Sequence, residues 1–258
     1  MEIIQKGVMR SGNVLLRLIL NHIFNEAPNS EKYNLNNFTD IDKEAFLNTV
    51  SQYKHSYRFF SEEAMDGQFI SKTTGKKEGG YLNPKMHSYE KLEKNNILII
   101  PWRDPRDNMI SFIRTEYSKI PPNPMFPWKN KFPTLDYIKQ SCKKTAKEQV
   151  EQFNIITKML KEHPKNNTLE LKYENYHNDF DYLFDKLEEY FQIKIVVDIR
   201  DYLKAQFNKE STTQFQKRVG DTFNNFCNKS HVHGEHVYKG DNKWKEILTP
   251  EILDIINP

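Results

Sequence analysis

The chain has 258 residues, of which 37% are hydrophobic and 28% are charged, and this length and composition predict a globular protein with a substantial core. The net charge of +3 is small. It excludes an extended basic surface of the kind that binds nucleic acid and is compatible with a local anion site.

Several other classes of protein are excluded by what the sequence lacks. Cys142 and Cys227 lie far apart and match no metal-binding spacing, so a disulfide scaffold is not expected. His231, His233 and His236 have no cysteine or carboxylate set at ligand spacing, so we expect no metal. No segment reaches the roughly 18 apolar residues that span a bilayer, and a signal-peptide pattern is absent. We therefore expect a cytoplasmic protein without a membrane partner.

The first predicted elements are a strand and a helix joined by a tight turn. Glu2 to Val8 predicts the strand, and the apolar residues from Val14 to Phe24 recur with a helical period. Between them, Gly7-Val-Met-Arg-Ser-Gly-Asn13 predicts the turn and the start of the helix. Such a start presents backbone N–H groups and a positive dipole end to a phosphate. Asn25 to Phe38 predicts a loop, and Lys43 to Val50 a short helix.

The clearest buried strand lies near the middle of the chain. Ile97 to Pro101 is a short aliphatic run that ends at Arg103-Asp-Pro-Arg-Asp107, and a following helix would bring Ser111 back to the same pocket. Phe59 to Gly80 predicts an exposed connection around a short strand. The proline-rich run from Ile120 to Pro127 is a loop, either a plain crossover or part of an acceptor-binding lid.

The rest of the chain alternates between helices and a strand. Helices are predicted from Leu135 to Leu160, from Phe180 to Phe191 and from Asp198 to Phe207, with a strand at Thr168 to Tyr173. There is no internal repeat and no clear linker. We therefore predict a single α/β domain over residues 1–258, with a central, mainly parallel sheet flanked by helices.

Two of these segments resemble the nucleotide-binding segments of sulfotransferases that use 3′-phosphoadenosine 5′-phosphosulfate (PAPS). Arg10-Ser-Gly-Asn-Val14 is similar to the segment that binds the 5′-phosphosulfate, although Val14 replaces a hydroxyl residue. Arg103 with Ser111 is similar to the pair that clamps the 3′-phosphate. The resemblance implies a P-loop-like sulfotransferase fold in which Arg10 contacts the sulfonate. The remaining residues that it implies at the 5′ end are Ser11, Gly12, Asn13 and Val14.

Three further segments carry the same resemblance. Pro84-Lys85-Met-His87 is similar to the Lys-x-His element in which the histidine is the general base and the lysine supports charge on the sulfonate. Tyr173 ends a strand resembling the family's Tyr-Glu-Asp strand, where it either faces the adenine or caps the core. Val237 to Lys245 resembles the family's C-terminal nucleotide loop, with Lys239 and Gly240 as contacts and Tyr238 in place of an arginine.

Together these segments imply an enzyme that transfers the sulfonate of PAPS to a hydroxyl or amine of a small-molecule acceptor. The product would be adenosine 3′,5′-bisphosphate, and no metal would be needed. A P-loop small-molecule kinase is the nearest alternative, but the GxxxxGK[ST] pattern is absent. Val14 and Tyr238 leave open a non-catalytic nucleotide-binding homologue, and Arg103 to Asp107 also reads as a charged helix cap. The sequence indicates neither the acceptor nor the oligomeric state.

Overall fold

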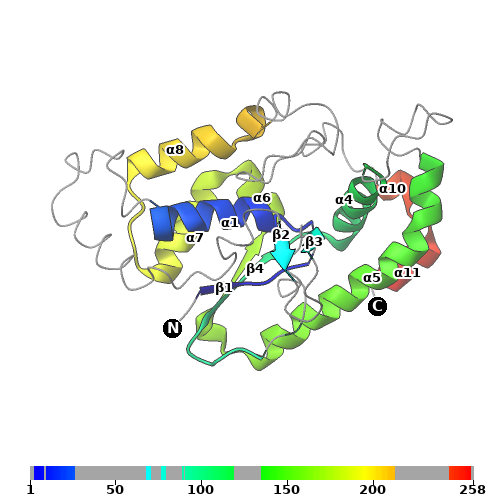
Figure 1. Ribbon diagram of the computed structural model, residues 1–258, viewed down its shortest axis with the longest axis horizontal. Helices are drawn as coiled ribbons and strands as arrows, with labels where there is room; N and C mark the ends of the chain where they lie inside the picture. Colours follow the sequence, from blue (N-terminus) through cyan, green and yellow to red (C-terminus); the bar gives the residue numbers. More distant parts are fainter. Residues whose placement is uncertain are drawn as a thin grey trace.

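A parallel sheet of three strands forms the centre of the protein (Figure 1). The computed structural model describes residues 3–8, 10–26, 68–70, 77–79, 89, 91–118, 135–212 and 244–256. Strand β4 (Ile97–Trp102) lies between β1 (Ile3–Gln5) and β5 (Thr168–Lys172), and both pairs are parallel. The carboxyl ends of the three strands therefore meet at one edge of the sheet, where α/β proteins bind their ligands.

Helices cover both faces of this sheet. Successive side chains of β4 point to opposite faces, and they therefore pack into two different cores. Ile97 and Ile99 pack in a cluster with residues of α1, α7 and α8, whereas Leu98 and Ile100 pack with Ile156 of α5. The bounds of these helices are α1 (Asn13–Asn21), α5 (Leu135–Glu162), α7 (Phe180–Phe191) and α8 (Val197–Phe207). The predicted α/β class, with a parallel sheet flanked by helices, is confirmed.

A third hydrophobic cluster, which includes no residue of the sheet, joins α4 (Pro105–Ser118) and α5 to the C-terminal helices. Met109 and Ile110 of α4 pack with Cys142 and Ala146 of α5. The C-terminal helices α10 (Trp244–Ile247) and α11 (Pro250–Ile256) complete this cluster. None of the helices in the described ranges, including the 28-residue α5, has both the length and the apolar composition needed to cross a membrane.

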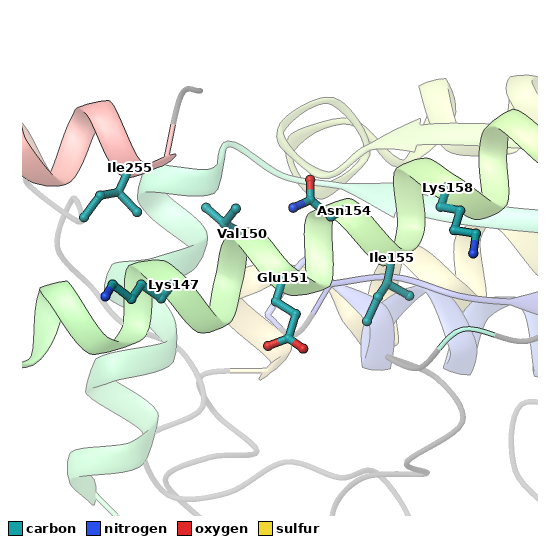
Figure 2. Close-up of a pocket in the computed structure, with 7 residues that line it drawn as sticks. All are labelled: Lys147, Val150, Glu151, Asn154, Ile155, Lys158 and Ile255. Carbon is teal, nitrogen blue, oxygen red and sulfur yellow. The ribbon is translucent and has the colours of Figure 1, made fainter.

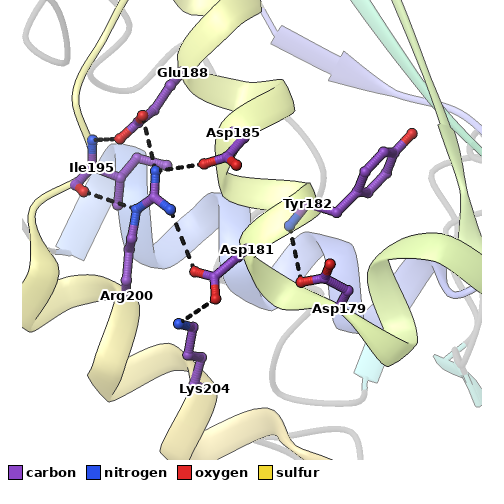
Figure 3. A network of polar contacts seen from close by, with 8 residues as sticks. All are labelled: Asp179, Asp181, Tyr182, Asp185, Glu188, Ile195, Arg200 and Lys204. Atoms are coloured by element: carbon purple, nitrogen blue, oxygen red, sulfur yellow. Dashed lines mark hydrogen bonds and ion pairs between the residues drawn. The ribbon is translucent and has the colours of Figure 1, made fainter.

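A network of charged side chains fixes α8 against α7 (Figure 3). Arg200 of α8 contacts Asp181, Asp185 and Glu188 of α7 at 3.4, 3.0 and 2.9 Å, and its side chain is only 16% exposed. Lys204 pairs with Asp181 at 2.7 Å. The hydrogen bond from Lys204 is the main reason that the pKa of Asp181 lies below its ordinary value, and Arg200 adds to the effect.

The predicted elements differ from the structure mainly at their ends. The first strand is shorter than predicted, and a π-helix, η1 (His22–Glu26), continues α1 into the predicted loop at Asn25. Tyr173, predicted to end a strand, begins α6 (Tyr173–Asn178). A 3₁₀ turn, η5 (Lys165–Asn167), precedes β5.

Two short elements occupy the region that was predicted as a connection around one strand. β2 (Gln68–Ile70) and β3 (Lys77–Gly79) pair in antiparallel fashion and form a separate two-stranded sheet. The prediction of one strand in this region was therefore wrong, because the region contains two. The predicted helix at 43–50 and the proline-rich loop at 120–127 lie outside the described residues.

Candidate anion-binding site

The turn between β1 and α1 has a backbone that only a few residues adopt readily. Gly12, the residue before the helix, has φ +83°, and Arg10 has φ +68° although it is not a glycine. A Cβ atom on Gly12 would lie 2.3 Å from the Tyr173 ring and 2.3 Å from the Tyr176 hydroxyl. Any side chain at position 12 would therefore displace the aromatic residues packed against the turn.

The first backbone amides of α1 have no acceptor within the helix. Intrahelical bonding begins where the Leu16 N–H donates to the Gly12 carbonyl at 3.1 Å. The N–H groups of Asn13, Val14 and Leu15 therefore precede the first intrahelical bond. No acidic residue stands in the first turn. This end of α1 thus has the partial positive charge that attracts an anion.

The side chains of Ser11 and Asn13 are turned into the protein. The Ser11 hydroxyl donates to the Val8 carbonyl at 2.6 Å, and the Asn13 amide donates to the same carbonyl at 2.7 Å. Gln5 of β1 in turn donates to the Asn13 carbonyl at 3.0 Å. Both side chains are almost completely buried. The Ser11 N–H donates to the Val8 carbonyl at 3.3 Å, so Asn13 is the one of these two residues whose backbone N–H can meet a ligand.

Arg103 follows β4 and reaches across to this turn. Its Nη1 donates to the Arg10 carbonyl at 3.1 Å, and its guanidinium lies 4.8 Å from the centre of the Tyr173 ring. Among the residues that the structure describes, Arg103 forms no ion pair with a carboxylate. A half-buried guanidinium without a carboxylate partner is well suited to bind an anion.

Arg10 links the turn to α4. Its Nε donates to the Ser111 hydroxyl at 3.3 Å, across 101 positions of the chain. Arg103, Arg10 and Ser111 are therefore joined by two hydrogen bonds that both involve Arg10. The two sequence segments that were predicted to converge do lie together, and we call Arg10, Ser111, Arg103 and the amides at the start of α1 the cradle.

The residues after Arg103 cap α4, as the alternative interpretation of this run predicted. Asp104 accepts a hydrogen bond from the Arg106 N–H at 2.9 Å, and Pro105 occupies the first helical position. The Arg106 side chain pairs with Asp104 and lies 4.0 Å from the centre of the Trp244 ring. Burial alone would raise the pKa of Asp104, but the hydrogen bonds from Arg106 outweigh it and lower that pKa. The cap and the cradle are compatible, because they use different arginines.

Tyr173 lies at the base of the turn and packs against the core, as one of its two predicted environments requires, while its place beside the adenine stays a prediction. The ring is half-buried, contacts Gly12, and makes an edge-on contact with Tyr176 at 5.5 Å between centroids. Arg103 covers its face. Burial raises the pKa of the Tyr173 hydroxyl above its ordinary value, so this group remains protonated at neutral pH.

Some predicted site residues lie outside the described part of the chain. These residues are Lys85, His87, Tyr238, Lys239 and Gly240, together with the three histidines at 231, 233 and 236. Their roles stay predictions. Among the described residues, no group of three or more histidine, cysteine or acidic side chains is arranged to hold a metal ion.

Two residues that support the cradle were missed from the sequence. The buried Tyr176 hydroxyl donates to the Ser11 and Gly12 carbonyls at 3.3 and 3.4 Å. Gln5 fixes Asn13 from the strand side. Tyr176 stands three residues after Tyr173, which places both on one face of α6 and was the available signal.

An open pocket lies along α5 near Ile255 of α11, apart from the cradle (Figure 2). Its lining residues are Lys147, Val150, Glu151, Asn154, Ile155, Lys158 and Ile255. None of these lining residues belongs to the cradle. We assign no ligand to this pocket.

Comparison with known proteins shows a distant likeness to a solved structure. No protein-family model and no curated protein matches the chain. Among solved structures, mouse sulfotransferase SULT7A1 complexed with PAP matches with a TM-score of 0.46 and 14% sequence identity. The match covers 98% of this chain and 80% of the mouse chain. Because this TM-score is below 0.5, the functional proposal rests on the geometry of the cradle and on the sequence motifs.

Proposed function

We propose that the chain is a PAPS-dependent sulfotransferase that transfers a sulfonate group to a hydroxyl or amine of a small-molecule acceptor. The observation that carries the proposal is the hydrogen bond from Arg103 to the carbonyl of Arg10. It joins the segment after β4 to the turn after β1, so that a cation without a carboxylate partner among the described residues lies beside helix amides that have no intrahelical acceptor. This arrangement supports the binding of a ligand with two anionic groups.

In this proposal the two ends of the nucleotide use different parts of the cradle. The backbone N–H groups of Asn13, Val14 and Leu15 hold the 5′-phosphosulfate, and Arg103 and Ser111 hold the 3′-phosphate. Tyr173 lies beside the adenine, and Lys239 with Gly240 completes the nucleotide site. Because arginine and amide groups meet the ligand's charge, the transfer needs no metal.

The proposed reaction is an in-line displacement at sulfur. The acceptor oxygen or nitrogen forms a bond to sulfur while the bond between sulfur and the bridging phosphate oxygen breaks, leaving adenosine 3′,5′-bisphosphate. His87 takes the acceptor's proton, and Lys85 balances the charge that develops on the sulfonate and the leaving oxygen.

Transfer of radiolabelled sulfonate from PAPS to a panel of phenols, alcohols and amines tests the proposed activity. We expect at least one acceptor class to be labelled. His87→Ala should lower turnover by about 10²- to 10⁴-fold, as the loss of a general base does, and should leave binding of adenosine 3′,5′-bisphosphate intact. Normal turnover in this variant would remove His87 from the proposed role. Binding of the nucleotide without transfer to any acceptor would favour the non-catalytic homologue.

A P-loop kinase is the alternative function that the turn supports, since Gly7 and Gly12 are spaced like the two glycines of the GxxxxGK[ST] pattern. However, Asn13 stands where the Walker lysine would be, and its side chain is bonded inside the turn. Protection against heat unfolding separates the two functions. Stronger protection by adenosine 3′,5′-bisphosphate than by ATP with Mg²⁺ supports the sulfotransferase, and the reverse order supports the kinase.

A further inference from the structure

The side chain of Arg10 extends from the turn to α4. Its Nε lies 3.3 Å from the Ser111 hydroxyl, and Ser111 stands on the second turn of α4. Because Nε belongs to the planar guanidinium, this contact brings the cationic group next to Ser111. The contacts that hold the 5′ end in the proposed function come from backbone amides at the start of α1.

The backbone of Arg10 is held in the conformation that produces this direction. Its φ of +68° is rare for a residue with a side chain, and such a conformation persists only where the surroundings hold it. Here Arg103 donates to the Arg10 carbonyl at 3.1 Å. Arg103 thus contacts one end of Arg10, and Ser111 contacts the other.

We propose that the Arg10 guanidinium belongs to the same phosphate subsite as Arg103 and Ser111, and that it makes the site select a nucleotide with a 3′-phosphate. This inference rests on the proposed function, in which Arg103 and Ser111 hold that phosphate. It differs from the expectation, implied by the resemblance, that Arg10 contacts the sulfonate. Two guanidinium groups and one hydroxyl are donors that match a phosphate monoester dianion.

The C-terminal segment is consistent with this assignment. Residues 237–245 include lysines but no arginine, and Tyr238 is uncharged. A lysine binds phosphate as a point charge, whereas a planar, two-donor contact requires a guanidinium. Arg10 supplies that group from the other end of the chain.

The test measures calorimetric affinities of 5′-AMP, 3′-AMP and adenosine 3′,5′-bisphosphate for the wild type and for Arg10→Gln. We expect Arg10→Gln to weaken 3′-AMP and the bisphosphate by about 10- to 100-fold, the range for a hydrogen bond to a charged group, and to leave 5′-AMP within about twofold. Arg106→Gln is the matched control, because Arg106 pairs with Asp104 outside the cradle, and all three affinities should be retained.

The outcomes separate this inference from the function on which it rests. If Arg10→Gln weakens 5′-AMP and the bisphosphate alike and spares 3′-AMP, Arg10 reads the 5′ end and the inference is wrong while the function stands. If the wild type binds none of the three nucleotides, the proposed function itself fails. Circular dichroism of each variant shows whether a lost affinity reflects unfolding.

Discussion

The side chain of Arg103 donates a 3.1 Å hydrogen bond to the backbone carbonyl of Arg10, 93 residues earlier in the chain. Arg106, three residues further on, is instead bonded to Asp104 and lies over Trp244. The two arginines at the start of α4 therefore have different tasks. Arg106 stabilises the helix end, while Arg103 connects it to the turn and keeps donors available for an anion.

Replacing Gly12 by alanine should disrupt the turn. The new Cβ would meet the Tyr173 ring and the Tyr176 hydroxyl at 2.3 Å, and φ +83° is unfavourable for alanine. We expect a loss of more than about 1 kcal/mol in the free energy of unfolding, together with loss of nucleotide binding. Urea unfolding and calorimetry measure the two effects. Val14→Ala, in the first turn of the same helix, is the control and should retain both; a Gly12→Ala protein as stable as wild type would contradict the described packing.

Tyr176→Phe should loosen the turn without a steric clash. The variant removes a buried hydroxyl that donates to the carbonyls of Ser11 and Gly12, and leaving such groups unsatisfied costs about 1 to 3 kcal/mol. Burial raises the pKa of Tyr176 well above its ordinary value, so the hydroxyl stays a donor. Tyr190→Phe, which loses an exposed hydrogen bond to Asn166, should cost much less. Equal losses in the two variants would show that the Tyr176 bonds do not support the turn.

Cys142 should resist alkylation in the folded protein. It is 1% exposed between α4 and the C-terminal helices, and burial raises its pKa from 9.0 to about 11. The thiolate, which is the reactive form, is therefore scarce at pH 8. Mass spectrometry after iodoacetamide treatment should find Cys142 unlabelled until denaturant is added. Because the folded pKa is raised, this group favours the fold fully below pH 9.0, and its contribution declines as the pH rises toward 11.

The charged network between α7 and α8 should make stability sensitive to acid. The folded pKa of Asp181 lies below 3.8, mainly through the hydrogen bond from Lys204, so its contribution is present above that value and is lost as the pH falls through the folded pKa. Arg200→Met should remove part of this dependence, and Lys186→Met, which breaks an exposed pair with Glu189, should not. Unfolding midpoints measured from pH 6 to pH 2 give the comparison. Parallel curves for wild type and Arg200→Met would contradict this account.

The sequence predicts the elements whose pattern is strong over their whole length. The aliphatic run at Ile97 to Pro101 is the central strand, and the helix from Phe180 to Phe191 has the predicted bounds. Apolar periodicity determines these elements locally, because each faces a core on a fixed side. The short pair β2 and β3 and the C-terminal helices α10 and α11 are too brief for a clear period, and they were missed.

The candidate site was predictable as a set of segments but not in the direction of its side chains. Two strand-to-helix turns carrying Arg10 and Arg103 were enough to predict that both lie at one edge of a parallel sheet. Asn13 is held by a hydrogen bond from Gln5 of the strand. The direction of the Arg10 side chain follows from a positive φ that a non-glycine residue rarely adopts. Both are consequences of tertiary contacts, which local sequence does not encode.

Calorimetric titration with adenosine 3′,5′-bisphosphate of wild type, Arg103→Gln and Arg106→Gln tests the central claim most directly. The cradle predicts binding by the wild type, a loss of about 10- to 100-fold in Arg103→Gln with unchanged unfolding, and full affinity in Arg106→Gln. Equal affinity in Arg103→Gln and the wild type, or no binding by any of the three proteins, would contradict it.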